Sequence, residues 1–441
     1  MGKNGSNRAF GSKSTTAIPG LASCSLCRTN VQYDNYPFCS KSSRTIRART
    51  EMRRKSLLRF AVTFAYLLLA GGAAQVWASS SERAYLAFVG TLTGRSAIGI
   101  YAYRFHPAGA HTEFLGLAAK TPAPTFLAVH PSQKFLYAVN ETAGKDRAGG
   151  NTVTAFRIDD RTAKLLTLNT VPSGGTGPCH AAVSGDGKVL VVTNCGSGSV
   201  AAFPIREDGS LAYASVVLQH QGSSVNPQRQ KGPHAHGVVI TPDSTKAFVA
   251  DLGLDKIFIY RLNSGSGSIE PSDPPTASLS PGAGVRHLAL DLSGNFLYAL
   301  SELDSAITVF RCSRHAVRQI QLISALPHDA PPQIGGSEIE LDAKGAFLYT
   351  SIRGAQNMIA VFAVDRNNGR LTAVQHISSG GRTPRHFAID PTHSFLFAAN
   401  QNSHSIAIFA IGADGRLRPT HRFLDDVESP ACIVFVEPHH G

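Results

Sequence analysis

The chain contains few of the residues that mark several large classes of protein. Its 441 residues include a single Trp and three Met, and only 16% of them are charged. Sparse charge together with 41 Gly and 24 Pro argues against a coiled coil or a helical bundle, because both need uninterrupted, charge-rich helices. The 43% hydrophobic fraction is enough for a large core and excludes a disordered chain. A glycine-rich, all-β globular protein remains.

Excess positive charge is confined to the start of the chain. Of the formal net charge of +12, residues 1–78 contribute +10, from twelve Lys and Arg against two acidic residues. Residues 79–441 therefore carry only +2. A nearly neutral globular part has no basic stripe with which to bind DNA or RNA, so we expect no nucleic-acid partner.

Residues 52–78 have the three parts of a secretory signal peptide. Basic residues follow Met52, an apolar run covers residues 60–70, and small residues precede a cleavage position after Ala78. We expect a periplasmic or secreted protein without stable membrane association after cleavage; an uncleaved anchor and a cytoplasmic protein are the alternatives. Residues 1–51 then form a mis-started or disordered extension, whose Cys24, Cys27 and Cys39 resemble half of a zinc site.

Residues 79–441 contain seven copies of one unit of about fifty residues. In each complete unit an opening strand and a tight turn precede a strand like Phe135-Leu-Tyr-Ala-Val-Asn140, and a further strand ends in an aromatic residue. The seven aromatic residues are Tyr103, Phe156, Phe203, Tyr260, Phe310, Phe362 and Phe409. Four antiparallel strands repeated in this way predict the blades of a β-propeller.

The two ends of the repeat array complete each other. The first copy, residues 85–117, lacks an opening strand, and residues 430–435 form an extra strand after the sixth complete unit. The sequence therefore predicts an all-β, seven-bladed β-propeller closed by a mixed blade of N- and C-terminal strands, with no free sheet edge between the first and last blades.

Polar residues recur where the opening strands start and the second strands end, and in a propeller these positions lie at one mouth of the channel. A long polar loop, residues 219–236, forms a lid over the same rim. Convergent polar groups at such a mouth predict a ligand site. The candidates are His180, Arg286, Glu302 and Glu338 as catalytic residues, and Arg229, His234, His236, His287, Arg353, Arg385, His386 and Asn400 as substrate-binding residues.

A structural role is the alternative for several of these residues. Opening-strand His residues often hydrogen-bond neighbouring turns, and Asn residues at strand ends often satisfy loop backbone. The arginines and glutamates are harder to explain in this way, because they break the repeat pattern and are costly to leave unpaired. Of the cysteines in the body, Cys179, Cys195, Cys312 and Cys432, we expect free thiols, with a pairing of Cys179 and Cys195 left open.

The motifs at these recurring positions resemble those of the seven-bladed-propeller lactonase family. The best-known activity of that family is 6-phosphogluconolactonase, and its relatives include the carboxy-cis,cis-muconate cycloisomerases. The resemblance rests on Tyr85–Thr91, Gly177–His180, Asn226–Gln230, Gly232–His236, Asp251–Asp255, Arg286–His287, Ser301–Asp304, Thr383–His386 and Asn400–Asn402. It implies a lactonase with its active-site histidine at His180 and its lid residues at Arg229, His234 and His236. The apparent signal peptide departs from the cytosolic setting of a pentose-phosphate enzyme.

The residues fit the chemistry of lactone hydrolysis. A base, His180 or a rim glutamate, activates water, and Arg286 or Arg229 stabilises the oxyanion or holds a phosphate or carboxylate. Neither a Gly-x-Ser-x-Gly elbow nor a nucleotide-binding Gly-x-Gly-x-x-Gly between a strand and a helix is present, so we expect neither covalent acyl-enzyme nor NAD chemistry. The expected substrate is a small-molecule lactone, hydrolysed without metal or cofactor. A metal-dependent lactonase with a carboxylate and Asn cage, a non-catalytic envelope-binding propeller and a cycloisomerase are the alternatives.

Expression from Met52 in a Gram-negative host should give a periplasmic protein that begins near Ser79, because the basic region, the apolar run and the cleavage site are all present. Cell fractionation with a cytosolic marker enzyme as control, followed by N-terminal sequencing, measures this. An intact N-terminus in the cytosol would contradict it and favour a cytoplasmic role.

Overall fold

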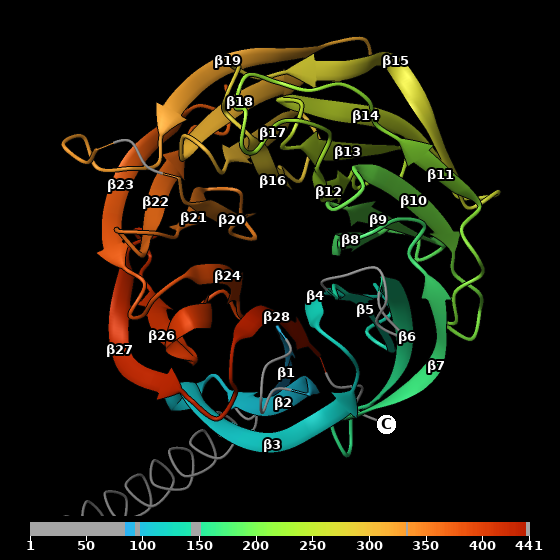
Figure 1. The fold of residues 1–441 in the computed structure, drawn as a ribbon. Coiled ribbons are helices and arrows are strands. Elements are labelled where there is room, and N and C mark those ends of the chain that lie inside the picture. The colour runs from blue at the N-terminus through green and yellow to red at the C-terminus, as the bar shows by residue number, and fades with distance from the viewer. Residues whose placement is uncertain (1–83, 93–97, 143–150, 332–333, 438–441) are drawn as a thin grey trace, which may run out of the picture. The chain divides into compact units, whose positions relative to one another are not determined.

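The computed structural model describes residues 84–92, 98–142, 151–331 and 334–437. The predicted signal peptide and extension, with Cys24, Cys27 and Cys39, lie outside these residues. The described chain forms seven four-stranded antiparallel sheets arranged around a central opening (Figure 1), which confirms the predicted seven-bladed propeller. No helix among these residues is long and apolar enough to cross a membrane.

Each blade is named here by its opening strand, which lies nearest the central opening in Figure 1. The β28 blade contains β28 (Pro430–Val436), β1 (Tyr85–Thr91), β2 (Gly99–His106) and β3 (His111–Lys120). The β4 blade contains β4 (Pro124–Val129), β5 (Phe135–Asn140), β6 (Thr152–Asp159) and β7 (Lys164–Pro172). The β8 blade contains β8 (Pro178–Val183), β9 (Val189–Asn194), β10 (Ser199–Pro204) and β11 (Val216–Gln219).

The other four blades follow the same order. The β12 blade contains β12 (Ala235–Ile240), β13 (Lys246–Asp251), β14 (Lys256–Asn263) and β15 (Ser268–Ser278). The β16 blade contains β16 (Val285–Leu290), β17 (Phe296–Ser301), β18 (Ala306–Cys312) and β19 (Val317–Ser324). The β20 blade contains β20 (Gly336–Leu341), β21 (Phe347–Ile352), β22 (Met358–Val364) and β23 (Leu371–Ser378). The β24 blade contains β24 (Pro384–Ile389), β25 (Phe395–Asn400), β26 (Ser405–Ile411) and β27 (Leu417–Leu424), and the described 3-10 turns are Ala108–Ala110 and Gln401–Ser403.

The C-terminal strand closes the ring. In the antiparallel pair of β28 and β1, Leu86 lies opposite Val436 and Val89 lies opposite Ile433. On its other side β28 packs against β24 and β4, the opening strands of the neighbouring blades. The predicted mixed blade of N- and C-terminal strands is therefore confirmed.

Neighbouring blades are held together by apolar faces on both sides of each sheet. Along β21, alternate side chains serve different neighbours: Leu348 packs with Tyr298 of the preceding blade, whereas Tyr349 packs with Leu396 of the following one. All four side chains are fully buried, and each large apolar side chain buried in this way contributes about 1.5–3 kcal/mol. The repeated Phe-Leu-Tyr pattern thus serves both interfaces of a blade.

The pairing of every opening strand with its neighbour contains a register break near the mouth of the channel. On the opening strands themselves it lies between Pro178 and His180 on β8, and at matching positions on β4, β12, β16, β20 and β24. A β-bulge re-aims a side chain at the point where it occurs. Two successive side chains of one strand therefore meet at the mouth, as Arg286 and His287 do with 3.0 Å between Nη1 and Nε2.

Deletion of residues 430–441 should leave β1 unpaired on its inner side and give an aggregating protein, because an exposed strand edge is a template for pairing with another chain. Size-exclusion chromatography measures this. Deletion of residues 438–441 alone, which spares β28, is the control and should elute like the intact chain. A soluble, unaggregated protein lacking residues 430–441 would show that closure does not protect the sheet.

Candidate active site

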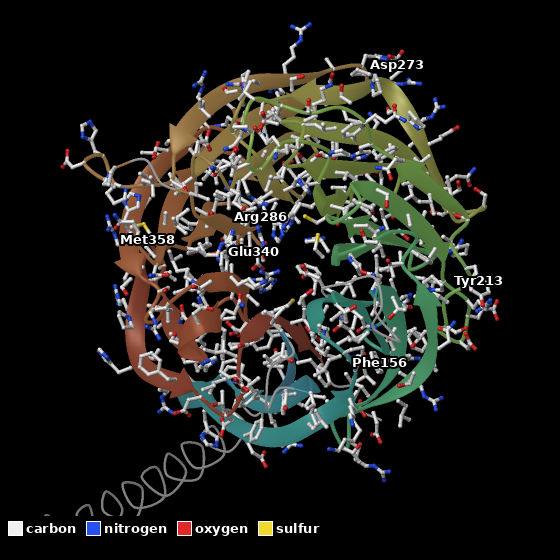
Figure 2. All side chains as sticks on the ribbon, viewed as in Figure 1. Phe156, Tyr213, Asp273, Arg286, Glu340 and Met358 are labelled. Carbon is white, nitrogen blue, oxygen red and sulfur yellow. The ribbon has the colours of Figure 1, made fainter. Side chains whose placement is uncertain are left out.

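The predicted rim residues meet at the channel mouth. In Figure 2, Arg286 and Glu340 lie beside the central opening, whereas Tyr213 and Asp273 lie on the perimeter. Phe126 stacks on His180 with 3.8 Å between ring centroids, and the edges of His287 and His386 approach the same phenyl ring. His236 lies 5.2 Å from His287 between centroids. Five different blades therefore place their opening-strand side chains in one cluster.

Glu338 is bound by two of these histidines. Its Oε1 lies 3.0 Å from Nδ1 of His287, and its Oε2 lies 3.3 Å from Nε2 of His386. Because Nε2 of His287 faces a guanidinium nitrogen of Arg286, which can only donate, the His287 proton is assigned to Nδ1. The Oε2 atom of Glu338 is buried and has no partner with hydrogen-bond geometry among the described residues.

Glu302 is the centre of an arginine cluster. Arg229 and Arg353 each donate to its carboxylate at 2.8 Å, and Nε of Arg286 lies 3.2 Å from it. The Arg286 side chain is almost fully buried, whereas Arg353 and Arg229 are 21% and 44% exposed. The exposed arginine edges are thus the parts of this cluster that a bound anion can reach.

A second ion pair lies on the other side of the mouth. Nη2 of Arg385 lies 3.4 Å from the carboxylate of Glu141, which also accepts a hydrogen bond from the Thr125 hydroxyl at 2.7 Å. Together the rim brings four arginines next to three carboxylates: Arg229, Arg286, Arg353 and Arg385 with Glu141, Glu302 and Glu338. The charge balance at the mouth is therefore slightly positive.

The predicted lid loop reaches the rim and is fixed to the neighbouring loops. Arg229 contributes its guanidinium to Glu302, while the buried Gln230 donates to the backbone oxygen of Leu252 and to Asp255. Nδ1 of His234 lies 2.8 Å from the backbone oxygen of Cys195. His234 therefore faces the β8 blade.

Burial keeps the four clustered histidines in their neutral form, while Arg286 keeps its charge. Burial lowers the pKa of His180, His236 and His287 well below the ordinary value, and it also lowers the pKa of His386. Burial, followed by repulsion from Arg353 and Arg385, lowers the pKa of Arg286 to about 10, so its guanidinium stays charged at neutral pH.

The glutamates respond differently to their surroundings. Burial alone would raise the pKa of Glu302, but the charges of Arg353 and Arg286 outweigh it and lower the value to about 2. Burial, with a smaller contribution from Glu338, raises the pKa of Glu340 to about 8. Glu340 lines a cavity of about 400 Å³ with Glu338 and His386 on the channel wall. Sequence reasoning missed Glu340, although its position two residues after Glu338 on a strand places it on the same face.

Asn400 does not join the cluster of charged residues. Its amide nitrogen donates to the backbone oxygen of Ser379 at 2.9 Å, and the side chain is fully buried. The matching Asn194 donates to the backbone oxygen of Ser173 in the same way. The strand-end asparagines thus have the alternative role considered for them, which is to hold a loop, and the structure gives Asn400 no contact that supports substrate binding.

The carboxylates of the alternative metal cage are already bound by nitrogen donors. Asp251 lies 2.6 Å from His220 and accepts the backbone N–H of His234, while Glu302 and Glu338 are held by arginines and histidines. Among the described residues one other group, Cys179, Cys195 and His236, offers metal-ligand atoms close together. Cys179, Cys195, Cys312 and Cys432 are free thiols, as expected.

Comparison with known proteins agrees with this architecture. The family model described as Lactonase, 7-bladed beta-propeller matches residues 86–435. The 6-phosphogluconolactonase of Bacillus subtilis is 32% identical over 355 residues, which cover 80% of this chain and 98% of that protein. The 6-phosphogluconolactonase of Formosa agariphila is 28% identical, with 73% and 91% covered. The solved structure of the periplasmic gluconolactonase of Pseudomonas aeruginosa is 35% identical, has a TM-score of 0.76, and is matched over 80% of this chain and all of that one.

In this closed propeller the charged, partly buried cluster places the candidate ligand site at the channel mouth. The chain belongs to the lactonase family of seven-bladed β-propellers and is an enzyme of the lactonase class. The family resemblance seen in the sequence is confirmed. These relatives do not bear on the cycloisomerases, whose relation to this chain stays a prediction.

Replacement of Glu302 by Gln should cost about 3 kcal/mol of stability at neutral pH, because it leaves buried arginine charge without its partner. The folded-state pKa of Glu302 is lower than the unfolded one, so its contribution is present above about pH 4.5 and is lost as the pH falls toward about 2. Denaturant unfolding at several pH values should show the variant approaching the intact chain in that range. Glu113→Gln, in an exposed pair with Arg104, is the control and should cost under about 1 kcal/mol; equal losses for both would contradict the analysis.

Proposed function

We propose that the chain hydrolyses a sugar lactone, in the manner of a 6-phosphogluconolactonase, at the channel mouth. The family and its named relatives support lactone hydrolysis. The observation that carries the proposal at this site is Oε2 of Glu338, a buried carboxylate oxygen that lies 3.3 Å from Nε2 of His386 without hydrogen-bond geometry, beside a cluster of neutral histidines. An oxygen of this kind is suited to accept a proton from water.

His180 supplies a hydrogen-bond donor in this scheme. Its Nδ1 accepts the backbone N–H of Val238 at 3.4 Å, which assigns the imidazole proton to Nε2. His180 is half-buried, whereas His236, His287 and His386 are buried, so among these four it is the one that a substrate reaches most easily. The Nε2–H group would donate to the lactone carbonyl or to the departing ring oxygen. The alternative that His180 is itself the base predicts a similar loss on its removal.

The arginines divide between support and substrate contact. Arg286 donates to the backbone oxygen of Ser337 at 2.5 Å and also contacts His287 and Glu302, so it orients the cluster and adds positive potential. Arg229 and Arg353 keep exposed edges and would bind a phosphate, a carboxylate or the developing oxyanion. The planar guanidinium groups of Arg229 and Arg353 therefore favour an anionic or strongly polar sugar lactone as the substrate.

The proposed location follows from the sequence and one relative. The similar gluconolactonase of Pseudomonas aeruginosa is periplasmic, and residues 52–78 have the pattern of a signal peptide. One similar protein is named a 6-phosphogluconolactonase and another a gluconolactonase, so phosphorylated and unphosphorylated sugar lactones are both candidate substrates. We therefore propose periplasmic action and assay both 6-phosphogluconolactone and gluconolactone, together with muconolactone.

Glu338→Gln and His180→Ala should each lower kcat by roughly 10²- to 10⁴-fold, the usual contribution of a positioned proton-transfer group. Arg353→Lys should mainly raise KM, because a point charge does not replace a planar fork. The chelator EGTA should change none of these rates. Initial rates with each lactone, after the fold has been checked by circular dichroism, measure these effects.

Glu113→Gln is the control for Glu338→Gln, because it removes a carboxylate from an exposed pair with Arg104 on the outermost strand of its blade and should keep kcat within a few-fold. Wild-type rates in both Glu338→Gln and His180→Ala would refute the mechanism. Loss of activity with EGTA that added Ca²⁺ or Mg²⁺ restores, and that Zn²⁺ does not, would favour a hard-metal enzyme. Binding of a lactone without turnover would favour the non-catalytic propeller.

A further inference from the structure

Two cysteines and one histidine meet beside the candidate active site. The sulfur atoms of Cys179 and Cys195 and a ring nitrogen of His236 all lie within 4.8 Å of one another. Cys179 occupies the register break of β8, Cys195 directly follows β9, and His236 stands at the start of β12. The cluster therefore joins the β8 blade to the β12 blade.

The His236 side chain is short of a partner in this cluster. It is 7% exposed, and its Nδ1 has no hydrogen-bond partner among the described residues. A buried polar nitrogen without a partner costs free energy. A cation bound at Nδ1 would offset that cost. Sulfur is a weak hydrogen-bond acceptor, so the neighbouring thiols do not remove the cost.

The donor set and the spacing suit a thiophilic metal ion. In a tetrahedral zinc site, with bonds of about 2.3 Å to sulfur and about 2.0–2.1 Å to nitrogen, neighbouring ligand atoms lie roughly 3.5–3.8 Å apart. The observed atoms reach that spacing with side-chain movements of about 1 Å or less. Cys179 and His236 are buried while Cys195 is half-buried, so one side of the cluster stays open to a fourth ligand such as water.

We propose that Cys179, Cys195 and His236 form a binding site for a zinc ion that links two neighbouring blades at the channel mouth. Neither sequence reasoning, which anticipated no metal, nor the lactonase activity assigns this site. On binding, each thiol passes its proton to solvent and donates a sulfur electron pair to the ion, without any change of oxidation state. The bound ion would fix the orientation of His236, which packs against His287 of the candidate active site.

A disulfide between Cys179 and Cys195 is the competing outcome, since the protein is expected in an oxidising compartment. It would remove two protons and two electrons from the pair and would leave His236 without a ligand. The structure has both sulfurs as free thiols, with the Cys179 sulfur 3.4 Å from the backbone oxygen of His236. The ring nitrogen of His236 close to both sulfurs therefore favours a metal ion over a disulfide.

The test uses the full chain with Cys24, Cys27 and Cys39 replaced by Ser, so that the N-terminal cysteines cannot bind the probe. Titration with Zn²⁺ should show about one equivalent bound per chain and a raised Tm. Co²⁺ in its place should give a thiolate-to-cobalt charge-transfer band and the intense visible bands of a tetrahedral ion.

Cys195→Ser should abolish the cobalt charge-transfer contribution of that sulfur and weaken Zn²⁺ binding by more than about 10²-fold. Cys312→Ser is the matched control, because it removes a thiol at the far end of β18 and should leave binding unchanged. His236→Ala tests the third ligand and should also weaken binding, with the fold checked by circular dichroism in every variant.

Three results would overturn the proposal. They are a cobalt complex without a thiolate charge-transfer band, Zn²⁺ binding that is unaffected by Cys195→Ser, and a Cys179–Cys195 disulfide in protein isolated without reductant, seen by mass spectrometry as two missing hydrogens and by metal analysis as no zinc. Each of these readouts is independent of lactone turnover, so failure of the proposed enzyme mechanism leaves the test intact.

Discussion

Convergence of seven opening strands on one axis is the constraint on which the rest of the structure depends. Around a narrow channel, an inward-facing side chain lies close to residues of other blades and finds many of its partners there. Glu338 of β20 meets His287 of β16 and His386 of β24, and Glu302, just after β17, meets Arg353 of the β20 blade. The charged cluster thus depends on closure of the ring, which the pairing of β28 with β1 completes.

The repeated register break brings more side chains to the channel mouth than regular strands would. A regular strand sends successive side chains to opposite faces, so only one of each neighbouring pair would reach the mouth. The break lets Arg286 and His287 act together, with the guanidinium of one fixing the proton position of the other. Cys179 uses the same position on β8 to reach the His236 backbone, which explains why the thiol cluster lies beside the catalytic candidates rather than elsewhere on the ring.

Periodicity in the sequence was enough to predict the blades, their number and their closure. It also predicted which strand positions meet at one mouth of the channel, because each of these features follows from the spacing between similar segments. Which charged side chains pair with one another was not predictable, because the pairing depends on distances between residues that lie far apart in the sequence. Arg229 and Glu302 are separated by 73 residues, and no local pattern links them. Asn400 and Glu340 mark the limits of this reasoning: Asn400 was assigned to the ligand, whereas its amide nitrogen donates to a loop backbone oxygen, and Glu340, which strand alternation places on the channel wall, was not singled out.

Lowering the pH weakens the interactions at the channel mouth in two separate pH ranges. The buried histidines have folded-state pKa values below the unfolded value of about 6.5, so the unfolded chain takes up protons first and their contribution to stability is lost as the pH falls below that value. The Glu302 cluster follows at lower pH, because its carboxylate keeps its charge until the pH approaches about 2. Between these ranges Glu302 is still ionised and paired with its arginines, whereas the contribution of the buried histidines to stability is already falling. The free energy of unfolding should therefore fall first with the histidines, below about pH 6.5, and then with the Glu302 cluster, below about pH 4.5, since the two halves of the mouth are held by groups of different pKa.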